Sequence, residues 1–170
     1  LQVILFRHIE VTGRHIFDAM YVGEAIASQL MNLSGKEVCA IKFALLLHDI
    51  GKIKTPIEIL NKPGPLTLGE WSIMSLHTKY TEDIIQPIRN DNVISMAASH
   101  HETHDGKGYH RRKTINELEE HQDIVNVADI MSALLAKREY KDALSYEDSM
   151  LIIKKEIEHN KKAKIELHDL

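Results

Sequence analysis

Apolar residues recur along the chain three and four positions apart, which is the spacing of an α-helix. The alternation of apolar and polar residues that is typical of a β-strand hardly occurs. The first helical stretch covers residues 13–31 and places Ile16, Met20, Gly23 and Ala27 on one face. This pattern predicts an amphipathic first helix.

A second helix is predicted over residues 36–48. The turn residues 32–35 (NLSG) end the first helix, and Ser34 can cap the second. The four apolar residues 44–47 (ALLL) are expected to be fully buried. Cys39, on the same helix, is expected to be a small buried hydrophobe.

The same spacing predicts helices along the rest of the chain. Thr67 and Glu70 form a capping-box pattern, which starts a helix that carries Trp71, Met74 and His77. The remaining elements are a short turn at 57–60 and helices over 81–89, 93–101 (capped by Asp91 or Asn92), 122–137 and 145–159 (capped by Ser145). Together they predict an all-α bundle of about seven to eight helices, in a single domain spanning residues 1–170.

Composition and charge narrow the classes of function. The chain has 170 residues, 44% of them hydrophobic, which is enough to bury a sizeable core. Its net charge of −4 disfavours a nucleic acid polymer or a membrane surface as a general partner. A single cysteine excludes an intramolecular disulfide and fits a reducing compartment, so a cytoplasmic domain is expected. Because the chain starts at Leu1 without a signal peptide, we expect a piece of a longer protein.

The stretch from His100 to His110, HHETHDGKGYH, is unusually rich in polar and titratable residues. Because unpaired polar groups cost free energy when buried, it is not an ordinary core segment. It predicts a metal site with a shaped entrance, in which a helix end delivers two imidazoles and a glycine loop follows. A histidine-rich surface loop, to which His104 would belong, is the alternative.

Further histidines and aspartates stand at helix ends or on helix faces elsewhere. With the pair above, the set is His15, His48, Asp49, His77, His100, His101 and Asp129. Imidazoles and carboxylates together suit transition metals such as Fe, Mn, Ni, Co or Zn. Neighbouring residues on a helix point about 100° apart, so His48 and Asp49 reach one site only if other helices surround them. Taken alone, His77 or Asp129 is more simply explained as a hydrogen-bonded core residue.

Several separated motifs occur in a particular order. His15 is followed by HDIGK, by WSIMSLH, by HHETHDGKGY and by VADIMSAL. In this order they resemble the HD superfamily of metal-dependent phosphohydrolases and, more closely, the HD-GYP domain. The resemblance covers about residues 10–145. It implies an all-α domain that degrades the bacterial second messenger cyclic di-GMP.

The resemblance implies a role for each matching residue. One metal ion would be held by His15, His48, Asp49 and Asp129, and Asp49 would bridge to a second ion held by His77, His100 and His101. Lys52 would contact a phosphate and assist the leaving oxygen. Phosphate would be clamped by Arg138 and Lys141, and the ligand pocket would be lined by Tyr109, with Gly106 and Gly108 letting the backbone approach the ligand.

The family chemistry follows from two divalent transition metal ions, with Fe or Mn favoured over Ni, Co or Zn. A hydroxide bridging the ions would attack phosphorus and open cyclic di-GMP to linear pGpG, or carry it on to GMP. Asp49 and Lys52 would be the catalytic residues. The resemblance also implies an upstream receiver or sensor domain and contact with diguanylate cyclase domains.

The chain departs from the family pattern at several positions. His110 replaces the proline of the GYP motif, which loosens the loop and weakens the expected diguanylate cyclase contact. As a loop residue, His110 is expected to be exposed. Ser132 replaces an aspartate, and Val11 replaces the glutamate of three-metal members, so two metals are expected. Lys137 and Glu139 also differ from the family residues.

Two other functions remain open at this point. One is an HD phosphohydrolase that acts on another nucleotide or on a related cyclic dinucleotide such as cyclic GMP-AMP. The other is a non-catalytic signalling module that binds the dinucleotide. The complete set of predicted ligands favours the enzyme over the module.

Overall fold

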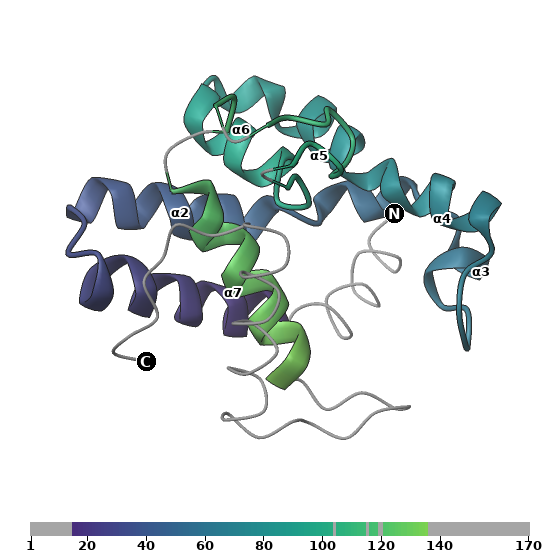
Figure 1. The fold of residues 1–170 in the computed structure, drawn as a ribbon, viewed down its shortest axis with the longest axis horizontal. Coiled ribbons are helices and arrows are strands. Elements are labelled where there is room, and N and C mark those ends of the chain that lie inside the picture. Colours follow the sequence, from purple (N-terminus) through teal and green to yellow (C-terminus); the bar gives the residue numbers. More distant parts are fainter. Residues whose placement is uncertain (1–14, 104, 115, 119–120, 136–170) are drawn as a thin grey trace.

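The computed structural model describes residues 15–103, 105–114, 116–118 and 121–135. These residues form helices joined by turns and loops (Figure 1), and the described part contains one isolated β-bridge, between Asp105 and Thr114, but no strand. The predicted all-α fold is therefore confirmed.

The first two helices run side by side along one edge of the molecule (Figure 1). The first covers residues 15–30 and ends in a π-helical turn, η1 (Ile26–Leu30). The second, α2 (Gly35–Leu47), starts at Ser34, whose hydroxyl accepts from the Glu37 amide while the Glu37 carboxylate accepts from the Ser34 amide. This reciprocal capping satisfies two amides that have no partner inside the helix.

The next elements form an arm beyond α2 (Figure 1). A 3₁₀ turn, η2 (Ile50–Lys54), leads to the short helices α3 (Ile57–Leu60) and α4 (Leu68–Ser75). The predicted Thr67–Glu70 capping box is present. We expected His77 on the helix that starts at Thr67, but that helix ends at Ser75 and His77 begins α5 (His77–Ile85).

The helix that leads to the histidine pair is shorter than predicted. It is α6 (Asp91–Ala98), it follows the 3₁₀ turn η3 (Gln86–Ile88), and its cap is Asn90 rather than Asp91 or Asn92. The Asn90 side chain accepts from the Val93 amide, so the helix begins earlier than predicted. It ends at Ala98, before the two histidines. The last described helix is α7 (Gln122–Leu135).

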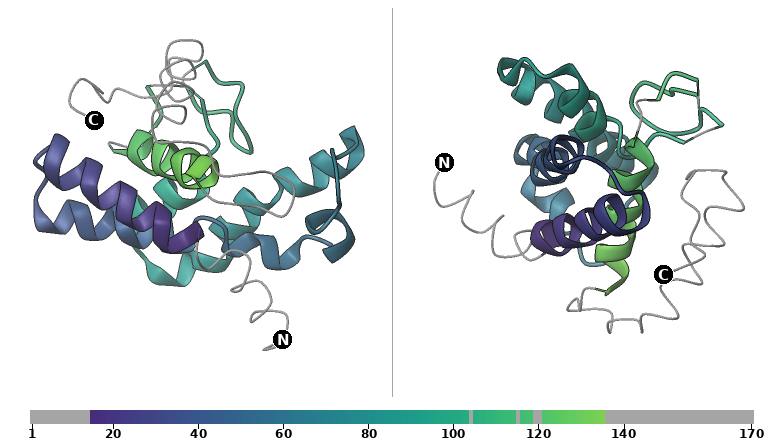
Figure 2. Two further views of the ribbon diagram at one scale, coloured as in Figure 1. Left: turned by 90° about the horizontal axis from the view of Figure 1, so that it is seen from below. Right: turned by 90° about the vertical axis from the view of Figure 1, so that its left-hand side faces the viewer.

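The core lies where the first helix, α2, α6 and α7 meet. Figure 2 shows two further views of how the helices are arranged. Ile41 and Leu45 from α2 contribute fully buried side chains, as do Ile124 and Val125 from α7. Gly23 lets the first helix approach closely, because a Cβ there would lie 2.4 Å from Leu45 Cδ1. This packing fixes the end of α2, where the predicted site begins.

The prediction that residues 44–47 are fully buried is wrong for Leu46, which is exposed, and for Leu47, which is only partly buried. The prediction that Cys39 is buried is also wrong. The exposed side chains of Cys39 and Leu46 line an open groove between the first helix and α2. Four consecutive residues of an α-helix point to all sides of its axis, but other helices cover only part of the circumference of α2. Some of the four side chains are therefore left exposed. The groove contains none of the predicted site residues.

The predicted helix 145–159 lies outside the described residues, as do residues 136–137 at the end of the helix predicted over 122–137. Among the helices that are described, none combines the length and the hydropathy needed to cross a bilayer.

Candidate metal centre

Three of the predicted histidines follow the C-terminal ends of three helices. His48 comes directly after α2, His77 comes two residues after α4, and His100 comes two residues after α6. Each ring donates from Nδ1 to the carbonyl oxygen three residues earlier: Leu45 (2.6 Å), Met74 (2.7 Å) and Ala97 (2.7 Å). Carbonyls in the last helical turn lack a partner inside the helix, so these bonds use acceptors that every helix end offers. The negative ends of the helix dipoles also favour a cation near these rings.

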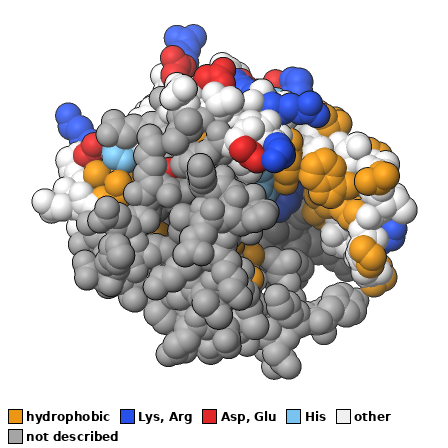
Figure 3. Space-filling model, in the orientation of Figure 1, with side chains coloured by type: hydrophobic (Ala, Val, Ile, Leu, Met, Phe, Trp, Pro, Cys, Tyr) orange, Lys and Arg blue, Asp and Glu red, His pale blue; other side chains and the backbone are white. Residues whose placement is uncertain are grey.

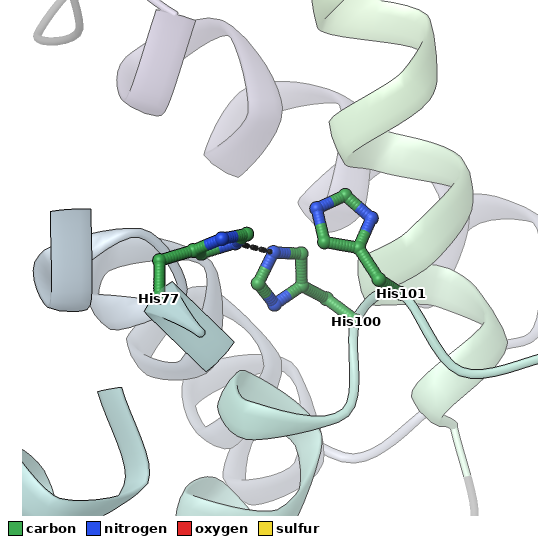
Figure 4. A group of neighbouring side chains, drawn as sticks. All are labelled: His77, His100 and His101. Atoms are coloured by element: carbon green, nitrogen blue, oxygen red, sulfur yellow. Dashed lines mark hydrogen bonds between the residues drawn. The ribbon is translucent and has the colours of Figure 1, made fainter. Parts of the chain in front are cut away.

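Because a carbonyl oxygen can only accept, Nδ1 carries a proton in all three rings, so the neutral form of each ring has its lone pair on Nε2. The Nε2 atoms of His77 and His100 lie 3.3 Å apart, and Figure 4 shows the two rings turned toward each other beside His101. Two neutral rings in this state present lone pair to lone pair, which is favourable only if they share a cation. Two donors bound to one zinc-like ion at about 2.1 Å lie roughly 3 Å apart, so the spacing fits a metal ion.

The two carboxylate oxygens of Asp49 face different groups of ligands. Asp49 Oδ1 lies 3.5 Å from His77 Nε2 and 3.8 Å from His100 Nε2. Asp49 Oδ2 lies 3.5 Å from His48 Nε2 and accepts from Lys52 Nζ. A carboxylate placed in this way can bridge two cations.

Asp129 and His15 meet His48 from other helices. Asp129 Oδ1 lies 2.9 Å from His15 Nε2 and 3.3 Å from His48 Nε2. The Ser132 hydroxyl donates to the Asp129 carbonyl and therefore accepts from His15 Nδ1, at 2.8 Å. Ser132 thus fixes the His15 tautomer that leaves Nε2 facing the centre, much as backbone carbonyls do for the other rings.

The site can be described as two clusters that share Asp49 and that meet at His100, whose donor atom also lies within 4.8 Å of those of His48 and Asp129. We call His15, His48 and Asp129 the Asp129 cluster, and His77, His100 and His101 the three-histidine cluster. Donor atoms of the three histidines lie within 4.8 Å of one another, and so do those of His15, His48 and Asp49. His48 Nε2 and Asp49 Oδ1 are buried without a hydrogen-bond partner among the described residues. Unpartnered donors of these types in a buried site fit divalent transition metals.

The electrostatics of the two clusters differ. Burial alone would lower the pKa of His48, but the Asp49 and Asp129 carboxylates raise it to about 9. In the three-histidine cluster, burial lowers the pKa of His77 and His100, and it lowers that of His101 to about 3. Burial would raise the pKa of Asp49, but the Lys52 ammonium and the nearby imidazoles hold it well below its usual range.

The loop after the histidine pair is tied down by Glu102. This carboxylate is 2% exposed and accepts from the backbone amides of Arg111, Arg112 and Lys113. Gly108 packs against the same segment, where a Cβ would lie 2.3 Å from Glu102 Cα. Gly106 adopts a left-handed φ of 72°, which glycine accepts without steric cost. Both glycines therefore shape the loop.

Tyr109 and His110 point from this loop in different directions. Tyr109 stacks on His101 with ring centroids 4.8 Å apart and meets Trp71 edge to face at 5.1 Å. His110 is half-buried and its nitrogens lie 3.0 Å from Thr78 Oγ1 and 3.1 Å from Glu82 Oε2. The expectation that His110 is exposed is therefore wrong, and its bonds to α5 anchor the loop that the missing proline was expected to loosen.

The structure thus brings together all seven predicted metal ligands, with Lys52 and Tyr109 beside them. Arg138, Lys141 and His104 lie outside the described residues, as do Val11, Lys137 and Glu139. Sequence reasoning assigned no role to Glu102 or Trp71, and it treated Ser132 only as a departure from the family. The signal that could have indicated a role for Glu102 is its position, as the one glutamate between the histidine pair and the two glycines.

Comparisons with known proteins show the family of the chain. The family model described as "HD domain" matches residues 20–161. A 3'3'-cGAMP-specific phosphodiesterase 2 of Vibrio cholerae is 38% identical over 134 residues, which are 77% of this chain and 26% of that protein. A cyclic di-GMP phosphodiesterase of Thermotoga maritima is 37% identical over 148 residues, 85% of this chain and 39% of that protein.

Solved structures show the same fold. A structure of a HDG"Y"P protein from Bdellovibrio bacteriovorus superposes with a TM-score of 0.69 at 20% identity, covering 87% of this chain and 47% of that one. The chain spans well under half the length of the two curated relatives. The resemblance to HD-GYP phosphodiesterases predicted from the sequence is confirmed, and the chain belongs to the HD domain family.

Proposed function

We propose that this chain is a metal-dependent phosphodiesterase domain that hydrolyses cyclic di-GMP to linear pGpG. The observation that carries the proposal is the arrangement of Nε2 lone pairs around Asp49, whose two oxygens face two separate clusters. No serine–histidine or cysteine–histidine pair is needed, because water can act as the nucleophile in such a centre.

Two metal ions fit the donors described above. One would be held by the Asp129 cluster and the other by the three-histidine cluster, with Asp49 touching both. Bound divalent ions supply an activated water and positive charge against the phosphate. The choice of Fe or Mn over Ni, Co or Zn is part of the proposal.

Lys52 is placed to act on the phosphate. Its ammonium contacts Asp49 Oδ2, and its side chain is 24% exposed, so it reaches from the buried centre toward solvent. From there we expect it to neutralise charge that develops on a phosphate oxygen and to protonate the leaving ribose oxygen. Arg138 and Lys141 would add further positive charge against the phosphate.

The loop supplies the wall of the site. The carboxylate of Glu102 and the close approach of Gly108 hold Tyr109 against His101. The Tyr109 ring would therefore exclude water from one side of the three-histidine cluster. This restricts the direction from which a substrate can enter.

The relatives support the substrate class but differ in the substrate that their names give. The Vibrio cholerae relative is named for 3'3'-cGAMP and the Thermotoga maritima relative for cyclic di-GMP. Both substrates contain a phosphodiester flanked by purine nucleosides. We favour cyclic di-GMP, with GMP as the product if pGpG is cleaved again before release.

The test is a substrate panel with protein of known metal content. Cyclic di-GMP, 3'3'-cGAMP, cyclic di-AMP and a linear dinucleotide are each incubated with protein loaded with Fe, Mn, Ni, Co or Zn, and the products are identified by chromatography. Fastest turnover of cyclic di-GMP, with pGpG as the first product, supports the proposal. Faster turnover of another member of the panel would mean that this compound, and not cyclic di-GMP, is the substrate. No turnover with any metal would refute the proposal that the chain is an enzyme.

A further inference from the structure

A row of aromatic rings leads from the three-histidine cluster to the surface. His101 stacks on Tyr109 with an interplanar angle of 29°, and Tyr109 meets Trp71 at 76°. The ring of His77 lies 6.3 Å from that of Tyr109. The row therefore starts among the predicted metal ligands and ends at Trp71 on α4.

Trp71 ends this row with much of its surface in water. The residue is 49% exposed, although tryptophan is usually mostly buried. It belongs to a group of exposed apolar residues on the arm, with Ile57, Leu68 and Ile73, and Figure 3 shows hydrophobic side chains gathered over this end of the molecule. An indole that is fixed on one side and open on the other provides a flat surface for a ligand.

We propose that Trp71, held in place by Tyr109, is a stacking platform for one purine base of the substrate. This inference rests on the proposed function for the position of the phosphate. A phosphodiester held at the metal centre has a nucleoside on each side, and the row of rings leads from the centre to Trp71, where one of the two bases could stack. The other residues of α4 offer no second aromatic ring.

The platform provides affinity and orientation without identifying the base. Every purine has a π-face that stacks on indole, whereas identity requires hydrogen bonds to the base edge. Stacking of one base on an aromatic side chain typically changes binding by about 5- to 150-fold. The platform therefore predicts purine cyclic dinucleotides as a class.

The chain offers a direct reporter, because Trp71 is its single tryptophan. Metal-loaded protein is titrated with GMP and, separately, with ribose 5-phosphate, and indole fluorescence is excited at its red edge, where guanine absorbs little. Saturable quenching by GMP but not by ribose 5-phosphate supports the platform. Equal responses to both ligands, or no response to GMP at concentrations where it competitively inhibits hydrolysis, would overturn it.

Kinetics separate a platform from a merely structural contact. In the substitution Trp71→Leu we expect kcat/KM for the preferred cyclic dinucleotide to fall about 5- to 150-fold, with most of the loss in KM. Trp71→Phe should recover most of the loss, because phenylalanine also stacks. Ile73→Ala is the matched control on the same helix: Ile73 is 40% exposed and its aliphatic side chain offers no ring on which a base could stack, so KM should stay within about twofold.

The outcomes distinguish the two proposals. Quenching by GMP without hydrolysis of any cyclic dinucleotide keeps the platform and refutes the enzyme. Hydrolysis with an unchanged KM in Trp71→Leu keeps the enzyme and refutes the platform. A parallel loss of kcat and of melting temperature in Trp71→Leu, not recovered by Trp71→Phe, would also refute the platform, since it would show a packing role.

Discussion

The two clusters around Asp49 both contain buried histidines, but they differ in the charge that surrounds those rings. The Asp129 cluster has a second carboxylate, which together with Asp49 raises the pKa of His48 to about 9. The three-histidine cluster has no carboxylate of its own among the described residues, and burial lowers the pKa of its imidazoles. Without metal, a proton can occupy the first cluster, whereas the second is left with facing lone pairs.

This difference affects how the proposed two-metal centre would depend on Asp49. Asp49 contributes one oxygen to each side, so it compensates charge where the histidines cannot. The three-histidine cluster then depends on Asp49 more than the Asp129 cluster does.

The substitution Asp49→Asn should have the largest effect. It keeps the shape of the side chain but removes the charge and one ligand oxygen from between the clusters. We expect turnover of the cyclic dinucleotide to fall by about three orders of magnitude or more, because the metal-held nucleophile is lost. Bound metal, measured by mass spectrometry, should fall most strongly at the three-histidine cluster. Asp83→Asn, at an exposed residue paired with Lys79, is the control. Unchanged turnover in Asp49→Asn would mean that the bridge is misassigned.

Removing one ligand from each cluster should separate them. We expect His101→Gln and His15→Gln each to remove about one bound metal ion per chain and to lower kcat by about 100-fold. Mutation of a residue that only hydrogen-bonds to a metal ligand already lowers metal affinity or activity by 10- to 100-fold. Metal titration by calorimetry should show one lost binding event in each variant. Loss of both ions in His101→Gln, but not in Asp49→Asn, would contradict the division proposed here.

The metal-free protein should be most stable between about pH 6.5 and 7. His101 has a folded pKa of about 3 and an unfolded value of about 6.5, so the unfolded chain binds more protons as the pH falls below 6.5. At pH 5 this costs about 2 kcal/mol in the free energy of unfolding. His48 behaves in the opposite way: its contribution is fully present below pH 6.5 and is lost as the pH rises toward 9. Denaturant titrations at pH 5, 6.5 and 9 measure the loss of stability on the acidic and on the alkaline side.

The matched variants sharpen this prediction. His101→Gln should reduce the loss of unfolding free energy below pH 6.5, and His48→Gln should reduce the loss above pH 6.5. Identical pH profiles for the wild type and both variants would show that other groups set the pH dependence.

Ser132→Ala should have the smallest effect. It removes the group that accepts from His15 Nδ1 but leaves His15 and Asp129 in place. We expect metal affinity at the Asp129 cluster to fall by about tenfold, with little change at the three-histidine cluster. Ser72→Ala removes a comparable side-chain hydrogen bond on exposed α4 and serves as the control. Equal metal loss in both variants would argue against a role for Ser132 in orienting the ring.

Local spacing was enough to predict the capped helices. Ser34 with Glu37, and Thr67 with Glu70, form the expected boxes because a cap depends on only four neighbouring residues. The break between α4 and α5 was predicted too late, between His77 and residue 81 instead of at Leu76. Exposure of Leu46 was missed, since it depends on which faces of α2 other helices cover.

The site could be predicted only in part from local pattern. His15 and Asp129 are 114 residues apart, and only the resemblance to a family indicated that they meet. The rings at helix ends carry a local signal that sequence reasoning did not use: a histidine just past a helix C-terminus can donate Nδ1 to the carbonyl three residues earlier. The burial of Glu102 depends on the loop folding back, which spacing does not show.

The most direct test is to locate the metal ions in crystals of the metal-loaded protein by anomalous scattering. The account predicts two ions per chain, one among the Asp129 cluster and one among the three histidines, with Asp49 in contact with both. A single ion, or two ions of which one does not touch Asp49, would contradict it.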